Sequence, residues 1–274
     1  MASNTQALPA TIASANAGIV LPAFSLWWRE IVRFYRQRSR VVGVIASPLL
    51  FWLVIGSGFG TSFRSGGAGG QHYLDYFFPG ALIMIVLFTA IFTMMSVIED
   101  RKEGFLLSVL VAPVSRSVIV LGKVKGGATL ATLQGLIFLV FAPFLGIHFT
   151  LVSFALTVLV IYLVAFSLTA LGFIIAWPMD STGGFHAVIN LFLIPLWLLS
   201  GSMFPLAGAS FWIRALMRIN PLTYATDALR MLLYPDALAG NLPLSTNLAV
   251  LAVFALVMFS LCFVVANRRK TTVA

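Results

Sequence analysis

The chain has 274 residues, of which 60% are hydrophobic and only 9% are charged. A soluble globular domain carries about a quarter charged residues, so this composition excludes one and predicts a membrane protein. The formal net charge of +9 could indicate nucleic-acid binding, but the basic residues flank apolar stretches and form no polar stripe. We therefore expect no nucleic-acid partner.

Six stretches of the sequence are apolar for about the length of a bilayer crossing. A spanning helix needs roughly 20 apolar residues. The sequence therefore predicts an all-α, polytopic membrane protein, with a flexible cytoplasmic tail over residues 1–25 and one six-span domain over residues 26–274. The six predicted transmembrane helices cover residues 41–59, 79–98, 126–147, 152–176, 185–205 and 246–266.

The distribution of Lys and Arg predicts the orientation. Residues 29–40 and the loop 99–125 hold five each, and the C-terminal tail holds three, whereas the loop 60–78 holds one. Cytoplasmic loops carry an excess of positive residues, so both termini are expected in the cytoplasm of a bacterial cell, with the chain in the plasma (inner) membrane. Three arginines in the loop 206–245 run against this trend.

Residues 27–40 are predicted to form a helix lying on the membrane surface. Its Trp, Phe and Ile residues share one face, and its arginines recur on the opposite face. This composition is typical of an interfacial amphipathic helix on anionic lipid, so membrane lipid is an expected partner. Anchoring alone is the simplest role, and contact with a cytoplasmic protein is the alternative.

The second predicted span ends in a dense run of charges, residues 99–103, followed by Gly104. Residues 105–111 are apolar but too few to span, and Pro113 follows them. This pattern is either a stop signal or a docking element for another protein. The mixture of both charge signs beside an apolar helix favours docking, with the apolar side in a groove and the charges at its rim.

Two short amphipathic segments, residues 210–218 and 221–233, precede the last span. Asn220 is suited to the N-cap position and Pro221 to the first helical position of the second segment. Neither segment can cross the membrane, so we predict an external re-entrant helical hairpin. Asp227 and Arg230 lie at i, i+3 and are expected to pair, and a functional role at membrane depth is the alternative.

No catalytic constellation is found in the sequence. The Gly-Lys pair at 122–123 lacks the Ser or Thr of a phosphate-binding loop. The three histidines, His72, His148 and His186, have no Cys or carboxylate at metal-ligand spacing. The middle of each predicted span lacks acidic residues, which argues against a proton-driven carrier. We therefore expect a transport protein that is not an enzyme and holds no metal or cofactor.

Three motifs together resemble the membrane domains of type 2 ABC exporters, over roughly residues 26–270. They are the charged segment 99–104 with the following stretch to Arg116, the segment 199–205, and the segment 219–230. The resemblance implies a permease that forms a homodimer or pairs with a related permease. It also implies two copies of a separate ATP-binding subunit, which would hold ATP and Mg²⁺. The implied cargo, leaving the cytoplasm or inner leaflet, is a hydrophobic drug, a lipid-linked molecule or a polysaccharide.

The same resemblance implies roles for individual residues. The segment that couples ATP-driven closure to span movement contains Glu99, Asp100, Arg101, Glu103 and Gly104. The hairpin that closes the outer end of the path contains Asn220, Pro221, Tyr224, Asp227 and Arg230. The second and fifth spans would line the path at the dimer interface, with a bend at Pro195. The candidate path residues are Asn190, Pro195, Trp197, Ser200 and Ser202.

Three other functions remain open from the sequence. The main one is an ion-coupled secondary carrier acting without an ATPase, which requires a titratable residue in the path. The others are an ABC-type subunit that mainly organises a complex, and a membrane enzyme. A neighbouring reading frame that encodes an ATPase would distinguish the first from an ABC permease.

Overall fold

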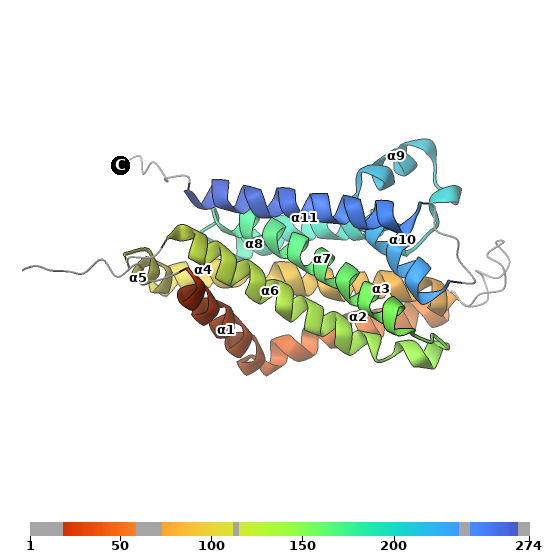
Figure 1. Ribbon diagram of the computed structural model, residues 1–274, viewed down its shortest axis with the longest axis horizontal. Coiled ribbons are helices and arrows are strands. Elements are labelled where there is room, and N and C mark those ends of the chain that lie inside the picture. The colour runs from red at the N-terminus through yellow and green to blue at the C-terminus, as the bar shows by residue number, and fades with distance from the viewer. Residues whose placement is uncertain (1–18, 59–72, 112–114, 236–241, 268–274) are drawn as a thin grey trace, which may run out of the picture.

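The computed structural model describes residues 19–58, 73–111, 115–235 and 242–267, and all regular structure in these ranges is helical (Figure 1). Most of the predicted tail (1–18), Arg64, Pro113 and the three basic residues at 268–270 lie outside the described residues. The helices are α1 (Val20–Arg36), α2 (Arg38–Gly58), α3 (Tyr73–Thr93), α4 (Met95–Lys102), α5 (Phe105–Val111), α6 (Arg116–Leu139), α7 (Leu151–Ala176), α8 (Thr182–Trp197), α9 (Phe211–Ile219), α10 (Pro221–Leu233) and α11 (Leu244–Asn267).

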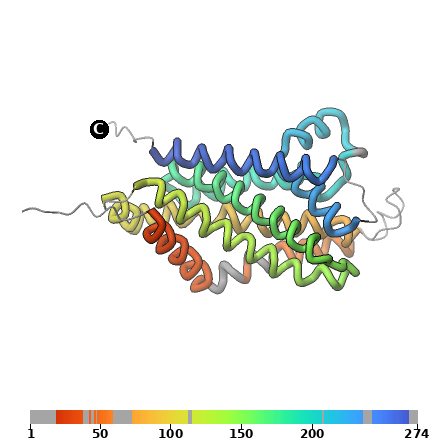
Figure 2. Tube along the Cα trace, in the orientation of Figure 1, coloured from red at the N-terminus to blue at the C-terminus, as the bar shows by residue number. Residues whose placement is uncertain are grey.

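The long helices run side by side along one axis, and α1 crosses them obliquely (Figures 1 and 2). One end of the bundle, here called the α5 end, carries α1, α4, α5 and the C-terminal end of α11 (Figure 1). Arg116 at the start of α6 donates a hydrogen bond to the Ala266 carbonyl there, at 2.9 Å. The opposite end, called the α9 end, carries α9 and α10 (Figure 1). The N-terminal helix and the end of the last helix thus lie at the same end.

Four helices of the described chain are long and apolar enough to cross a membrane. They are Tyr73–Lys102, which joins α3 and α4, Leu151–Ala176, Thr182–Ser202 and Leu244–Asn267. Helix α2 contributes a shorter apolar stretch, Pro48–Gly58. Helix α6 has the length but begins at Arg116 rather than at residue 126, so it includes Lys123 and Lys125. The chain is thus a multi-pass, all-α protein, and the count of six remains a prediction.

Helix α3 forms the centre of the bundle. It packs against α2, α6, α7 and α8, and its side chains are buried on nearly every face, including Phe77, Phe78 and Ile85 at 0% exposure. A helix buried all round is apolar all round, which explains why this stretch shows no amphipathic period. Its continuation as α4 brings the charges at 99–103 to the α5 end.

Helix α1 differs from the expected surface helix. It begins at Val20, so residues 20–25, expected in the tail, are helical. It packs closely along α6, where a Cβ atom on Gly122 would lie 2.5 Å from the Leu26 Cβ, and one on Gly126 would lie 2.9 Å from the Glu30 Cβ. Two small residues four positions apart permit such an approach. The contact with α6 therefore orders residues that a free tail would leave unpacked.

Candidate functional site

A cluster of charged side chains joins α1, α4 and α6 at the α5 end. We call it the charge cluster. Its members are Arg29, Glu30 and Arg33 on α1, Ser96, Glu99 and Asp100 on α4, Glu103 just after α4, and Lys123 on α6.

Asp100 lies at the centre of the charge cluster and is completely buried. The Arg29 guanidinium donates to both of its carboxylate oxygens, at 2.9 and 2.8 Å. Arg33 donates at 2.6 Å, and the Lys123 ammonium also donates to it. Burial disfavours the charged form of Arg29, but the hydrogen bonds and negative charge of Asp100 prevail and raise the pKa of Arg29. Bidentate pairing of this kind fixes geometry as well as charge.

Lys123 is the other buried charge, with 1% of its side chain exposed. Its ammonium donates to Glu30 at 2.6 Å and to the Ser96 hydroxyl at 3.0 Å. The Ser96 hydroxyl in turn donates to Glu30 at 2.7 Å. A buried ion pair is tolerated only when its remaining hydrogen-bonding capacity is satisfied, which these contacts achieve.

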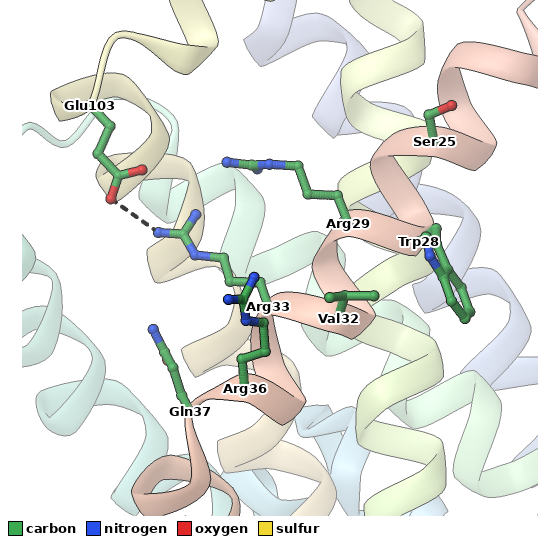
Figure 3. A pocket seen from close by; sticks show the side chains of 8 residues that line it. All are labelled: Ser25, Trp28, Arg29, Val32, Arg33, Arg36, Gln37 and Glu103. Atoms are coloured by element: carbon green, nitrogen blue, oxygen red, sulfur yellow. Dashed lines mark hydrogen bonds and ion pairs between the residues drawn. The ribbon is translucent and has the colours of Figure 1, made fainter.

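The outer members of the charge cluster are more exposed. Arg33 donates to Glu99 at 2.9 Å and to Glu103 at 3.4 Å, and the carboxylates are 24% and 60% exposed. Figure 3 shows Arg33 reaching from α1 to Glu103 across a surface groove that Arg29 and Arg36 also line. The arginine face of α1, expected to meet lipid headgroups, thus turns Arg29 and Arg33 towards carboxylates of the same chain. The acidic run at 99–103 supplied the partners that neutralise them.

Arg101 points away from the charge cluster and ties α4 to the turn between α7 and α8. Its guanidinium donates to the Met179 carbonyl at 2.8 Å, to the Asp180 carboxylate at 2.9 Å and to the Trp177 carbonyl. Gly104 has φ of +76°, a left-handed conformation that glycine adopts without strain, and it turns the chain from α4 into α5.

Helix α5 packs one side on the bundle and leaves the other side open. Leu106 is buried, and the Arg29 guanidinium lies 3.7 Å from the centroid of the Phe105 ring. Leu107, Leu110 and Val111 are exposed by 66%, 37% and 77%. The free apolar side of α5 is therefore a surface that could be covered by another protein.

The charged side chains among the predicted coupling residues, Glu99, Asp100, Arg101 and Glu103, hold α4 to α1 and to the α7–α8 turn. The open surface lies beside them, on Leu107, Leu110 and Val111 of α5. Glu30, Ser96 and Lys123 were not predicted as members of this site. A contact between these segments could have been predicted from their charges. Helix α1 carries three basic side chains, and residues 99–103 include three acidic ones.

The predicted hairpin residues lie at the α9 end. Asn220 caps α10 by accepting from the Leu222 amide at 3.0 Å, and it donates to the Leu196 carbonyl at 2.6 Å. Pro221 is the first residue of α10, as expected. The Tyr224 hydroxyl donates to the Arg218 carbonyl at 2.8 Å. Two short helices before the last span are thus present, and their re-entrance into the membrane stays a prediction.

Arg230 and Asp227 bind different elements. Arg230 donates to the Gly201 carbonyl at 2.7 Å and lies 4.1 Å from the centroid of the Tyr76 ring. The Tyr76 hydroxyl donates to the same carbonyl at 3.1 Å. Asp227 accepts from the Asn247 amide at 3.1 Å. Arg230 thereby joins α10, α3 and the π-helical turn Leu198–Ser202 after α8, and the pairing with Asp227 stays a prediction.

The predicted path residues divide by burial. Asn190 and Pro195 are exposed on α8. Trp197, Ser200 and Ser202 are buried, and the Trp197 indole donates to the Gly80 carbonyl of α3 at 2.8 Å. The irregular backbone lies in the turn after α8, where Gly201 has φ of +78°.

An apolar cavity of about 680 Å³ lies between α2, α3 and α8. It extends from Met84 on α3 to Met95 at the start of α4, and Trp197 is the one predicted path residue in its described wall. Its described wall has no carboxylate, lysine or arginine. The described lining residues are Gly43, Pro48, Phe51, Met84, Phe88, Phe92, Met95, His186, Ile194 and Trp197.

Comparison with known proteins identifies the family. Residues 23–234 match the ABC-2 type transporter family. The chain belongs to this family. It is 30% identical to the inner membrane transport permease YadH of Escherichia coli (strain K12), over 90% of this chain and 94% of that protein. It is 23% identical to nodulation protein J of Rhizobium leguminosarum bv. viciae, over 89% and 93%.

A third similarity is partial. "Probable multidrug ABC transporter permease YbhR" of Escherichia coli (strain K12) is 28% identical over 60% of this chain and 45% of that protein. The resemblance to type 2 ABC permeases is thus confirmed. The chain is a multi-pass membrane permease of an ABC transporter, a transport subunit of a kind that generally pairs with an ATP-binding subunit.

Proposed function

We propose that this chain is the permease subunit of an ATP-driven exporter in a bacterial inner membrane. It moves a hydrophobic drug-like or lipid-linked substrate out of the cytoplasm or inner leaflet. Two copies of a separate ATP-binding subunit bind its cytoplasmic face, hold ATP and Mg²⁺ and hydrolyse the nucleotide. The observation that carries the substrate class is the apolar cavity between α2, α3 and α8.

The cavity favours an apolar substrate over a free polysaccharide. Sugar hydroxyls that lose water need hydrogen-bonding partners, and burying each without one costs roughly 1–3 kcal/mol. The described lining is made mainly of Phe, Met, Trp, Ile and Pro side chains, which supply few such partners. The name of the relative YbhR, a multidrug permease, agrees with an apolar substrate.

The α5 end is the proposed docking site for the ATP-binding subunit. The exposed apolar side of α5 enters a groove on that subunit, and the charge cluster transmits its movement to α1, α4 and α6. This end is assigned to the cytoplasm, together with both termini, because it carries the positive-rich segments. The α9 end, where Arg230 holds α10 against α3, then faces outwards and closes the path.

A second permease copy is proposed to cover the open side of the cavity. Leu191, Phe192 and Ile194 of α8 are more than half exposed, and Val54 on α2 is 66% exposed. These residues add exposed apolar surface to the two helices that border the cavity, so a homodimer, or a pair with a related permease, would cover that surface and enclose the cavity.

The ion-coupled carrier is the alternative function. The described cavity wall offers this carrier one titratable side chain, His186, whereas the side chains of the charge cluster lie outside that wall. Their compact ion pairing also suits a structural joint better than a site that binds and releases a proton.

Co-expression with the ATP-binding subunit of a neighbouring reading frame tests the proposal. We expect the two proteins to copurify and substrate-stimulated hydrolysis to appear only in the complex. Leu107 is 66% exposed, so covering it contributes about 1–2 kcal/mol, and Leu107→Asn should weaken binding roughly fivefold to thirtyfold. Leu151→Asn, an exposed leucine at the start of α7, is the matched control. Equal binding by both variants would contradict the docking site.

A further inference from the structure

Hydrogen-bonding atoms are scarce in the wall of the apolar cavity. Two of its described side chains carry nitrogen, Trp197 and His186. The indole nitrogen of Trp197 is occupied, since it donates to the Gly80 carbonyl at 2.8 Å. Among the described lining residues, His186 is therefore the one whose side chain leaves hydrogen-bonding atoms open to a ligand.

The position of His186 is set by an aromatic contact. Its ring centroid lies 5.1 Å from that of Phe92 on α3, with the two ring planes inclined by 42°. This contact orients the imidazole at the part of the cavity nearest the α5 end. Neither ring nitrogen hydrogen-bonds to any residue in the described part of the chain, and the side chain is exposed. A neutral imidazole offers one donor and one acceptor.

The cavity therefore has two chemically different ends. His186 and Trp197 are eleven positions apart on α8, which at 1.5 Å per residue corresponds to about 16 Å of helix axis. One end has a hydrogen-bonding group, and the rest of the described wall offers mainly aromatic, Met and Pro surface. Pockets of this composition bind the ligand body by apolar contact and fix its orientation through a few polar groups.

We propose that His186 recognises the hydrogen-bonding head of an amphipathic substrate whose aromatic or aliphatic body occupies the cavity between α2, α3 and α8. This rests on the proposed function and narrows its substrate class. A molecule that lacks a polar head enters the same cavity but gives up this contact, so His186 determines specificity among apolar molecules of similar size.

Two probes of matched shape test this, pyrenebutanol, which has a hydroxyl head, and butylpyrene, which lacks one. Because Trp197 lines the cavity and the chain has six tryptophans, the part of the tryptophan-to-pyrene energy transfer that is lost in Trp197→Phe reports binding to the purified full-length permease in nanodiscs. His186→Leu removes the hydrogen-bonding group, and His186→Gln keeps one. His148→Leu, an exposed histidine before α7 and outside the described wall, is the matched control.

We expect pyrenebutanol to bind the parent protein about fivefold to tenfold more tightly than butylpyrene, the ratio that one net hydrogen bond provides. His186→Leu should abolish this preference and leave the affinity for butylpyrene unchanged. His186→Gln and His148→Leu should retain the preference. An equal loss for both probes in His186→Leu, or an unaltered preference, overturns the role of His186 while the cavity stands. A parent protein that binds neither probe saturably contradicts the proposed cavity itself, and this inference with it.

Discussion

Replacing Lys123 with methionine should destabilise the permease strongly. The substitution keeps the length of the side chain but removes the cation that binds Glu30 at 2.6 Å in a site with 1% exposure. Removing one partner of a buried ion pair costs about 3–5 kcal/mol, because the other charge stays buried. Asp100 keeps Arg29 and Arg33, and Glu30 keeps the Ser96 hydroxyl, so we place the loss near the lower limit, at about 3 kcal/mol.

The thermal midpoint followed by tryptophan fluorescence measures this loss in purified protein. At about 2–4 °C per kcal/mol for a chain of this size, Lys123→Met should lower the midpoint by about 6–12 °C. Lys125→Met is the matched control, since Lys125 is exposed on the same helix and its loss should cost no more than about 0.5 kcal/mol.

A double variant separates charge from packing. Lys123→Met combined with Glu30→Gln removes both charges of the pair, so we expect it to recover much of the loss. Equal midpoints for Lys123→Met and Lys125→Met would refute the reasoning, because the buried ammonium would then contribute nothing. A double variant as unstable as the sum of its two single variants would show that the effect does not arise from the pair.

Three further outcomes are expected. Ser245→Cys should react with an impermeant thiol reagent in intact cells and Thr272→Cys should be protected, and the reverse pattern would overturn the proposed orientation. Gly126→Ala places a Cβ atom 2.9 Å from the Glu30 Cβ, so it should lower the free energy of unfolding by about 1–3 kcal/mol. The amide hydrogens of α1 should then exchange faster, and an unchanged exchange rate would contradict the close packing of α1 on α6. Arg230→Leu removes the hydrogen bond to the turn after α8 and should raise the leakage of substrate from loaded proteoliposomes. Leakage equal to that of the parent protein would argue against a closing role at the α9 end.

The spans that could be predicted most precisely are those with uninterrupted apolar runs. Helices α7 and α11 begin and end within two residues of the expected limits, because their charges lie only outside the membrane-spanning run. Helix α6 was placed ten residues too late. Its first turns contain Lys123 and Lys125, which predict a surface segment unless a buried partner neutralises one of them.

The charge cluster could not be predicted because its contacts join distant segments. Glu30 and Lys123 are 93 positions apart, and Arg29 and Asp100 are 71 apart. The sequence revealed the charged run at 99–103 and the arginine face of α1, but each had a local explanation. The charged run could be a stop signal after a span, and the arginine face could contact anionic lipid. The cavity was missed for a related reason. His186, Ile194 and Trp197 share one face of α8 with Asn190, and the packing of that face against α2 and α3, which are distant in the sequence, decides which of these residues line the cavity.

Transport in proteoliposomes tests the central claim most directly. Inside-out vesicles are prepared with this chain alone and with this chain plus its ATP-binding subunit. Uptake of pyrenebutanol into each is measured with ATP and Mg²⁺, and separately with an imposed proton gradient. We expect uptake only with the subunit and ATP, and a lower uptake in the Leu107→Asn variant at equal protein level. Uptake by this chain alone, driven by the proton gradient, would contradict it and favour the carrier.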